Sequence, residues 1–297
     1  MTRSLVESSG VGAYTKRVAE DGRVVRPLAW LAVGMLCWRE VVRFFRQRNR
    51  VVGAIGQPLV FWLLFGAGLE RSFSLSPAGA SGHTFREYYF PGSLMLILLF
   101  TAIFATISII EDRREGFLQS VLVAPIPRWS MVLGKVLGGS LIALVQGLVF
   151  LVLALTLNVR LTASTLASLT ALMFVSALAL TSLGFVIAWR MDSTQGFHAI
   201  MSLVLMPMWL LSGAFFPIPA LSPAASWSQV IMHWGMRLNP LTYCVAGARR
   251  LLFDGAAAAA FWVPGLTTCW AVALLFAIAT FAAAWTIAGQ RTTGDLL

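Results

Sequence analysis

The sequence predicts an all-α integral membrane protein with six transmembrane helices, and three observations support this fold class. Of the 297 residues, 58% are hydrophobic and 11% are charged, whereas a soluble domain carries roughly 25% charged residues. Six stretches reach the length of about 20 residues that a helix needs to cross a bilayer. Within them Lys135 is the only Asp, Glu, Lys or Arg. The predicted spans are residues 51–69, 90–110, 132–157, 166–189, 197–216 and 263–288.

The regions outside the spans divide the chain into three parts. Residues 1–27 contain no apolar run long enough for a secretory signal, so we expect a mobile cytoplasmic tail and a first span that acts as its own insertion signal. Residues 28–290 are expected to form one transmembrane domain. Residues 291–297 are then a short cytoplasmic C-terminal tail.

The distribution of positive charge predicts the orientation. The net charge is +10, and ten of the 22 Lys and Arg residues lie in the first fifty positions. With Lys135 counted in its adjacent loop, the two tails and the even-numbered loops hold 16 Lys and Arg, and the odd-numbered loops hold six. The positive-inside rule therefore places both termini in the cytoplasm, in a multi-pass protein of the cell inner membrane. The basic charge is explained by the membrane surface, and we expect no nucleic-acid partner.

The segment before the first span predicts an amphipathic interfacial helix over residues 28–50. Its arginines fall within about 60° of each other on a helical wheel. They are Arg39, Arg43, Arg46 and Arg50. Two interpretations fit this pattern: a helix that lies flat on the inner leaflet and braces a cytoplasmic partner, or simple anchoring of the first span.

The second loop, residues 111–130, predicts a short cytoplasmic helix. Five of its first six residues are charged, Gly116 follows, and an apolar piece over residues 117–124 is ended by Pro125 and Pro127. This segment could bind a partner protein, or it could be an interfacial turn in which the prolines only end the helix.

The fifth loop, residues 217–262, is too apolar for a free loop. It predicts two extracellular re-entrant half-helices over residues 224–237 and 241–252, separated by Asn239 and Pro240. They would cap the outer end of the bundle, or one of them would only pack on the outer leaflet.

Polar and small residues inside the spans suggest a path and a packing seam. Gln57, Gln146 and Met208 are candidate residues of a translocation path; the two glutamines could equally form interhelical hydrogen bonds, and the methionine could belong to ordinary core packing. Gly134 and Gly138 form a GxxxG pair, which fits packing within one subunit or a dimer seam.

The chain lacks the motifs of an enzyme. It contains no Gly-x-x-x-x-Gly-Lys-[Ser/Thr] loop for ATP, no His-Glu-x-x-His and no Gly-x-Ser-x-Gly. No catalytic residue, resident cofactor or metal site is therefore expected. The spacing of the histidines and cysteines fits neither a metal site nor a disulfide framework. These residues are His83, His198, His233, Cys37, Cys244 and Cys269.

Three stretches, residues 111–135, 212–218 and 239–252, resemble the permease subunits of ABC-2 type exporters, as in daunorubicin-resistance and nodulation-factor export permeases. With the six-span plan the resemblance covers about residues 28–290. It implies a permease that pairs with a second permease subunit, as a homodimer in the membrane lipid. It also implies two copies of a cytoplasmic ABC ATPase, which would hold the ATP and Mg²⁺.

The resemblance also implies roles for particular residues. The coupling helix that binds the ATPase would comprise Glu115, Gly116, Phe117, Leu118, Gln119 and Pro125. The connecting helix would carry Arg39, Arg43, Arg46 and Arg50, and the outer gate would comprise Ser212, Gly213, Phe215, Phe216 and Pro217. One departure concerns the acidic residue that the family often places shortly before the basic residue ahead of the last span. Residues 245–248 offer none before Arg249, which weakens an outer ion-pair role for Arg249 or Arg250.

The predicted function is an ATP-driven exporter permease for an amphipathic or hydrophobic cargo, such as a drug, an antibiotic or a lipid-linked molecule. An alternative is a polysaccharide or glycolipid exporter with the same mechanism. A secondary transporter driven by an ion gradient fits less well, because the sequence shows neither inverted repeats nor a carboxylate at the bilayer midplane.

Overall fold

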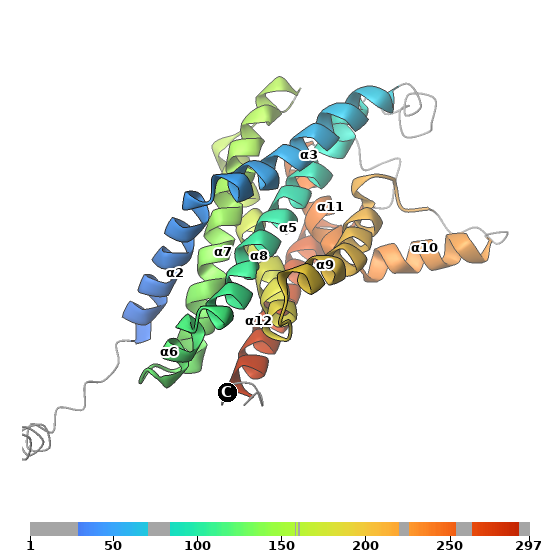
Figure 1. Cartoon of the computed structure of the whole chain (residues 1–297). Coiled ribbons are helices and arrows are strands. Elements are labelled where there is room, and N and C mark those ends of the chain that lie inside the picture. The colour runs from blue at the N-terminus through green and yellow to red at the C-terminus, as the bar shows by residue number, and fades with distance from the viewer. Residues whose placement is uncertain are drawn as a thin grey trace, which may run out of the picture.

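The protein is a bundle of long helices with short helices at its ends and side (Figure 1). The computed structural model describes residues 29–70, 84–157, 159, 161–219, 226–253 and 263–290. The described residues form helices and short connections, with no strand among them. Both tails, at 1–27 and 291–297, lie outside the described residues.

Six helical segments are long and apolar enough to cross a membrane, so the predicted number of spanning helices is confirmed for the described residues. They are α3 (Arg48–Gly68), α5 (Phe85–Arg114), α7 (Arg128–Leu151) with the 3-10 turn Val152–Thr156, α8 (Ala163–Trp189), α9 (Thr194–Trp209) with the π-helical turn Leu210–Ala214, and α12 (Leu266–Gly289). The predicted spans 51–69, 90–110, 132–157, 166–189, 197–216 and 263–288 each overlap one of these segments.

The second spanning helix, α5, extends beyond its predicted apolar stretch at both ends. Its start is fixed by a capping box, in which the Thr84 hydroxyl accepts from the backbone N–H of Glu87 and the Glu87 carboxylate accepts from the backbone N–H of Thr84. At the other end the helix continues through Glu111 and Asp112 to Arg114, because these residues find partners described below.

Helix α5 is the centre of the bundle. It packs against α3, α7 and α8, and 89% of its most apolar window is buried inside the protein, compared with 22% for α3. Helices α3, α9 and α12 therefore present most of their surface to the outside of this single chain.

Helix α2 (Ala29–Arg46) runs along α7 and is separated from α3 by a break at Gln47. The close approach requires glycine: a Cβ on Gly138 would lie 2.7 Å from the Cβ of Glu40, and one on Gly134 would lie 2.8 Å from the Cβ of Leu36. Packing within one subunit is therefore confirmed as the role of this GxxxG pair.

Three shorter helices complete the part of the chain that the structure describes. Helix α6 (Phe117–Val123) follows α5 at one end of the bundle, where α2 also begins. Helices α10 (Trp227–Leu238) and α11 (Pro240–Leu252) match the two predicted helical pieces of the fifth loop. Helix α11 packs against α5, α8 and α12, whereas α10 extends sideways from the bundle (Figure 1).

Candidate functional site

The short helix α6 is shaped by the glycine and the prolines that flank it. Gly116 precedes it with φ of 75°, a left-handed conformation that L residues with a side chain rarely adopt. After Val123 the chain is extended at Ala124 and turns through Pro125 and Pro127 into α7. The sequence thus ends α5 sharply and directs a separate helix across the end of the bundle.

The two faces of α6 differ in exposure. Leu118 is buried in the core, and Phe117 is half-buried. Gln119, Ser120 and Val123 are exposed, with Val123 at 84%. Of the predicted coupling residues, Leu118 therefore anchors the helix, and Gln119 and its exposed neighbours form the free surface.

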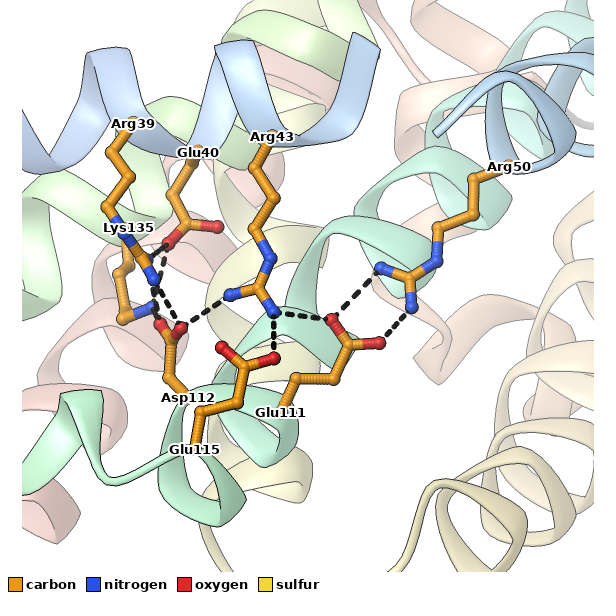
Figure 2. A network of polar contacts seen from close by, with 8 residues as sticks. All are labelled: Arg39, Glu40, Arg43, Arg50, Glu111, Asp112, Glu115 and Lys135. Carbon is orange, nitrogen blue, oxygen red and sulfur yellow. Dashed lines mark hydrogen bonds and ion pairs between the residues drawn. The ribbon is translucent and has the colours of Figure 1, made fainter. Parts of the chain in front are cut away.

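A cluster of ionic contacts joins α2 and α3 to the end of α5 beside α6 (Figure 2). Both terminal nitrogens of Arg39 donate to the Asp112 carboxylate, at 2.7 and 3.0 Å. Arg43 donates to Asp112 at 2.5 Å, to Glu111 at 3.0 Å and to Glu115 at 3.1 Å. Arg50, at the start of α3, pairs with Glu111. The cluster thus holds three helices together through side chains far apart in the sequence.

The buried part of this cluster lies between α2, α5 and α7. The Lys135 ammonium lies 2.8 Å from a carboxylate oxygen of Glu40 and 2.5 Å from one of Asp112. All three residues are almost completely buried, with Asp112 at 0% exposure. Buried charges persist only when they are paired and hydrogen-bonded, and Asp112 accepts from three different cations.

The cluster reaches α6 through Arg39. The Arg39 guanidinium lies 3.6 Å from the centroid of the Phe117 ring, a cation–π contact. Burial alone would lower the pKa of Arg39, but the hydrogen bond and charge of Asp112 outweigh it and raise the pKa above its usual value. Arg39 therefore stays charged and connects the first residue of α6 to α2 and α5.

Two further arginines fix the end of α5 on its other side. Arg113 donates to the backbone carbonyl of Trp189 at 2.6 Å, and Arg114 donates to that of Asp192 at 2.9 Å. These carbonyls lie at the end of α8 and in its connection to α9. The charged residues of the predicted loop are thus mostly engaged within the chain.

The sequence interpretations of the arginine stripe did not foresee this cluster. Arg39, Arg43 and Arg50 bind carboxylates of the same chain, whereas Arg46 is exposed and forms no ion pair among the described residues. The stripe precedes the first predicted span and the acidic residues 111–115 follow the second, so both lie at the same end of the bundle. Their opposite charge was the signal that could have paired them. Glu40, an acid among these arginines, was the other missed residue.

The predicted gate residues lie together at the opposite end of α5. Helix α9, the fifth span, ends in the π-helical turn Leu210–Ala214, in which Gly213 has φ of 73°. Ser212 and Gly213 are buried, and the Phe215 ring packs edge-on against Phe85 and Tyr89. Phe216 is 38% exposed, and Pro217 borders a small hollow beside Ser212. The turn is therefore locally irregular and packed on the start of α5.

A cavity of about 270 Å³ lies between α3, α5 and α9. Its wall is mostly apolar, with three polar residues, Gln57, His198 and Ser202. The lining also includes Leu99, Phe100, Ile103, Phe104, Met201, Leu205 and Met206. Exposed polar side chains on membrane-spanning helices face a cavity or a partner rather than lipid. The cavity therefore has the composition of a small-molecule site.

The predicted path residues separate in the structure. Gln57 lines the cavity, but Gln146 is buried elsewhere and accepts a hydrogen bond from Thr101 at 2.7 Å. Met208 is not among the lining residues, and its carbonyl accepts from the Asn239 amide. His198, which the sequence placed only at a span end, and Ser202 are polar residues of the cavity that sequence reasoning missed.

The structure offers no metal centre among its described residues, since no three His, Cys, Asp or Glu side chains gather there. Cys37, Cys244 and Cys269 are free thiols.

The six long apolar helices define a multi-pass membrane protein. The sequence pattern of the ABC-2 type transporter matches residues 32–253, from within α2 to just beyond α11. The chain therefore belongs to the ABC-2 type transporter family, whose members are transport permeases and typically work with an ABC ATPase partner. A protein of Cyanophora paradoxa that carries the name of a transport permease, ycf38, is 25% identical over 218 residues, which cover 71% of this chain and 72% of that protein.

Proposed function

We propose that the chain is the permease subunit of an ATP-driven exporter that moves an amphipathic or hydrophobic molecule out of the cell. The observation that carries this proposal is the position of α6: its exposed face lies at the end of the bundle, Leu118 on its other face is buried in the core, and the Arg39 guanidinium of α2 lies over its Phe117 ring. A force applied to α6 would therefore pass directly to the spanning helices.

In this proposal the partner ATPase binds the exposed residues Gln119, Ser120 and Val123. The α6 end of the bundle is then cytoplasmic, as the distribution of Lys and Arg indicates, in the inner membrane. Two permeases form a homodimer and two ATPases bind it, so that ATP-driven closure of the ATPases moves both α6 helices. The ATP and Mg²⁺ belong to the partner, since this chain has no phosphate-binding loop.

The cavity between α3, α5 and α9 supports the choice of cargo. Aromatic and sulfur-containing side chains of Phe100, Phe104, Met201 and Met206 provide adaptable apolar surface. Gln57 and its polar neighbours add a few hydrogen-bonding groups, and among the described residues no Asp, Glu, Lys or Arg lines the wall. Such a wall suits an uncharged or weakly polar region of an amphipathic molecule better than a polysaccharide chain.

The first expected result is that drug export requires the partner ATPase. Vesicles that contain the permease and its ATPase should concentrate a hydrophobic fluorescent drug only when ATP is added on the α6 side, and the drug should accelerate ATP hydrolysis. The permease alone should show no uphill transport. Uphill transport by the permease alone under an ion gradient would contradict the proposal, and transport of an undecaprenyl-linked sugar but of no drug would favour the glycolipid alternative.

A change at Gln57 should alter which cargo is preferred. Gln57→Leu removes a hydrogen-bonding group from the cavity wall, so the concentration of a hydrogen-bonding drug that half-stimulates ATP hydrolysis should rise about fivefold. A purely apolar drug should retain its wild-type value. The measurement is ATP hydrolysis against drug concentration for a panel of both kinds.

The matched control is Gln146→Leu. Gln146 is an equally polar residue inside a span, but it bonds to Thr101 away from the cavity. This variant should lose thermal stability and keep the drug preference. The same preference profile for wild type and Gln57→Leu would remove Gln57 from the path.

A further inference from the structure

Arg249 of α11 is buried at the end of the bundle opposite α6, and it contacts the end of span five. One of its terminal nitrogens donates to the carbonyl oxygen of Gly213 at 3.0 Å and to that of Tyr88 at 3.2 Å. Its guanidinium also lies 4.2 Å from the centroid of the Tyr88 ring. Only 7% of Arg249 is exposed. A buried cation thus joins α11, the start of α5 and the π-helical turn.

The carbonyl of Gly213 needs such partners because the helix is interrupted there. Gly213 has a left-handed conformation inside the turn Leu210–Ala214, and the end of a helix leaves carbonyl groups without partners in the helix. The Tyr88 hydroxyl donates to the same Gly213 oxygen at 3.2 Å. Two side chains from two different helices therefore hold this one carbonyl in place.

The turn and α5 are in close contact beside these bonds. A Cβ on Gly92 would lie 2.4 Å from the Cβ of Ala214, and the Trp209 indole donates to the Gly92 carbonyl at 2.9 Å. Outward opening of the bundle would have to separate these surfaces. The bonds of Arg249 and Tyr88 to Gly213 oppose that separation, since each spans the two sides.

We propose that Arg249 is a positioning residue of transport, which holds the end of span five against α5 and keeps the outer gate closed until ATP drives it open. This inference rests on the proposed export function for the step that ATP drives, but the closed gate itself can be tested without ATP or cargo. Arg250 provides a matched control, because it donates to the carbonyls of Val263 and Pro264, which precede α12, and not to span five.

The experiment measures access to a single cysteine in the gate. Ser212→Cys is introduced into the full chain after Cys37, Cys244 and Cys269 are replaced by alanine, and the protein is placed in vesicles. The labelling rate by a membrane-impermeant maleimide is then measured from the outer side without nucleotide. Ser212 borders the hollow that Arg249 also lines and is almost fully buried, so the starting rate should be low.

Arg249→Gln should raise the labelling rate by about tenfold or more, because it removes two charged hydrogen bonds that favour the closed gate. Arg249→Lys should restore part of the protection, and Arg250→Gln should keep the starting rate. Tyr88→Phe, which deletes one hydrogen bond and keeps the ring, should raise the rate about threefold and provides the test if Arg249→Gln does not fold. Unchanged labelling in Arg249→Gln and Tyr88→Phe, or an equal rise in Arg250→Gln, would overturn the role of Arg249.

A second arm separates this inference from the proposed function. The Ser212→Cys permease that keeps Arg249, assembled with its ATPase, should become labelled when a non-hydrolysable ATP analogue is added. If the analogue does not expose Ser212→Cys while Arg249→Gln exposes it without nucleotide, Arg249 closes the gate and the ATP-driven opening is refuted.

Discussion

Replacing Lys135 with methionine should lower the melting temperature of the detergent-purified protein by about 10 °C. The change removes the cation that lies between the buried carboxylates of Glu40 and Asp112. Loss of one partner from a buried ionic group costs about 3–5 kcal/mol, because the remaining charge is left in a low-dielectric interior. Asp112 still has Arg39 and Arg43, so most of the loss comes from Glu40.

The double variant Glu40→Gln with Lys135→Met tests this division. After the loss of Lys135, Glu40 keeps only its 3.4 Å contact with Arg39. Removing this buried carboxylate should restore more than half of the lost melting temperature, since Asp112 keeps its two guanidinium partners. Arg46→Met, at an exposed position of the same arginine stripe, should leave the melting temperature within about 2 °C of wild type. A melting temperature of the Lys135→Met protein equal to that of wild type would show that the buried ions do not stabilise the fold.

The chemistry of the bilayer explains why the spans were predictable. Each spanning helix must be apolar over most of its length, so it appears in the sequence as a run of about 20 apolar residues. The same argument singled out Lys135 as the one charge within the predicted spans. It could not identify Glu40 and Asp112 as partners, because they come from α2 and α5, and the pairing arises only when both pack against α7.

The positions of α6 and of the two helices in the fifth loop were also predictable from local signals. Gly116 and Pro125 mark the limits of α6, and the fifth loop carries prolines and an Asn-Pro pair that separate its two helices. The cation–π contact of Arg39 with Phe117 and the bonds of Arg249 with Gly213 were not predictable. They depend on the distance between helices that are remote in sequence, which no local pattern records.

The largest functional effect is expected from Gly116→Val, which should reduce drug-stimulated ATP hydrolysis by at least about tenfold while the permease still inserts in the membrane. A left-handed conformation costs a residue with a Cβ about 1–2 kcal/mol, and a β-branched side chain is an outlier there. A Cβ at Gly116 would meet no atom within 4 Å, so the substitution acts through the backbone and not through a clash. The turn would relax, and α6 would no longer be held at its angle to α5.

Gly116→Asn is the matched control, because asparagine adopts the left-handed conformation more readily than other residues with a side chain. It should retain most of the stimulated hydrolysis, although it adds more side-chain atoms than alanine does. Gly116→Ala should fall between the asparagine and valine variants. If all three variants lost stimulation equally, the glycine would be required for space against the ATPase rather than for its backbone conformation. Full stimulation in Gly116→Val would show that the angle of α6 does not transmit the force of the ATPase.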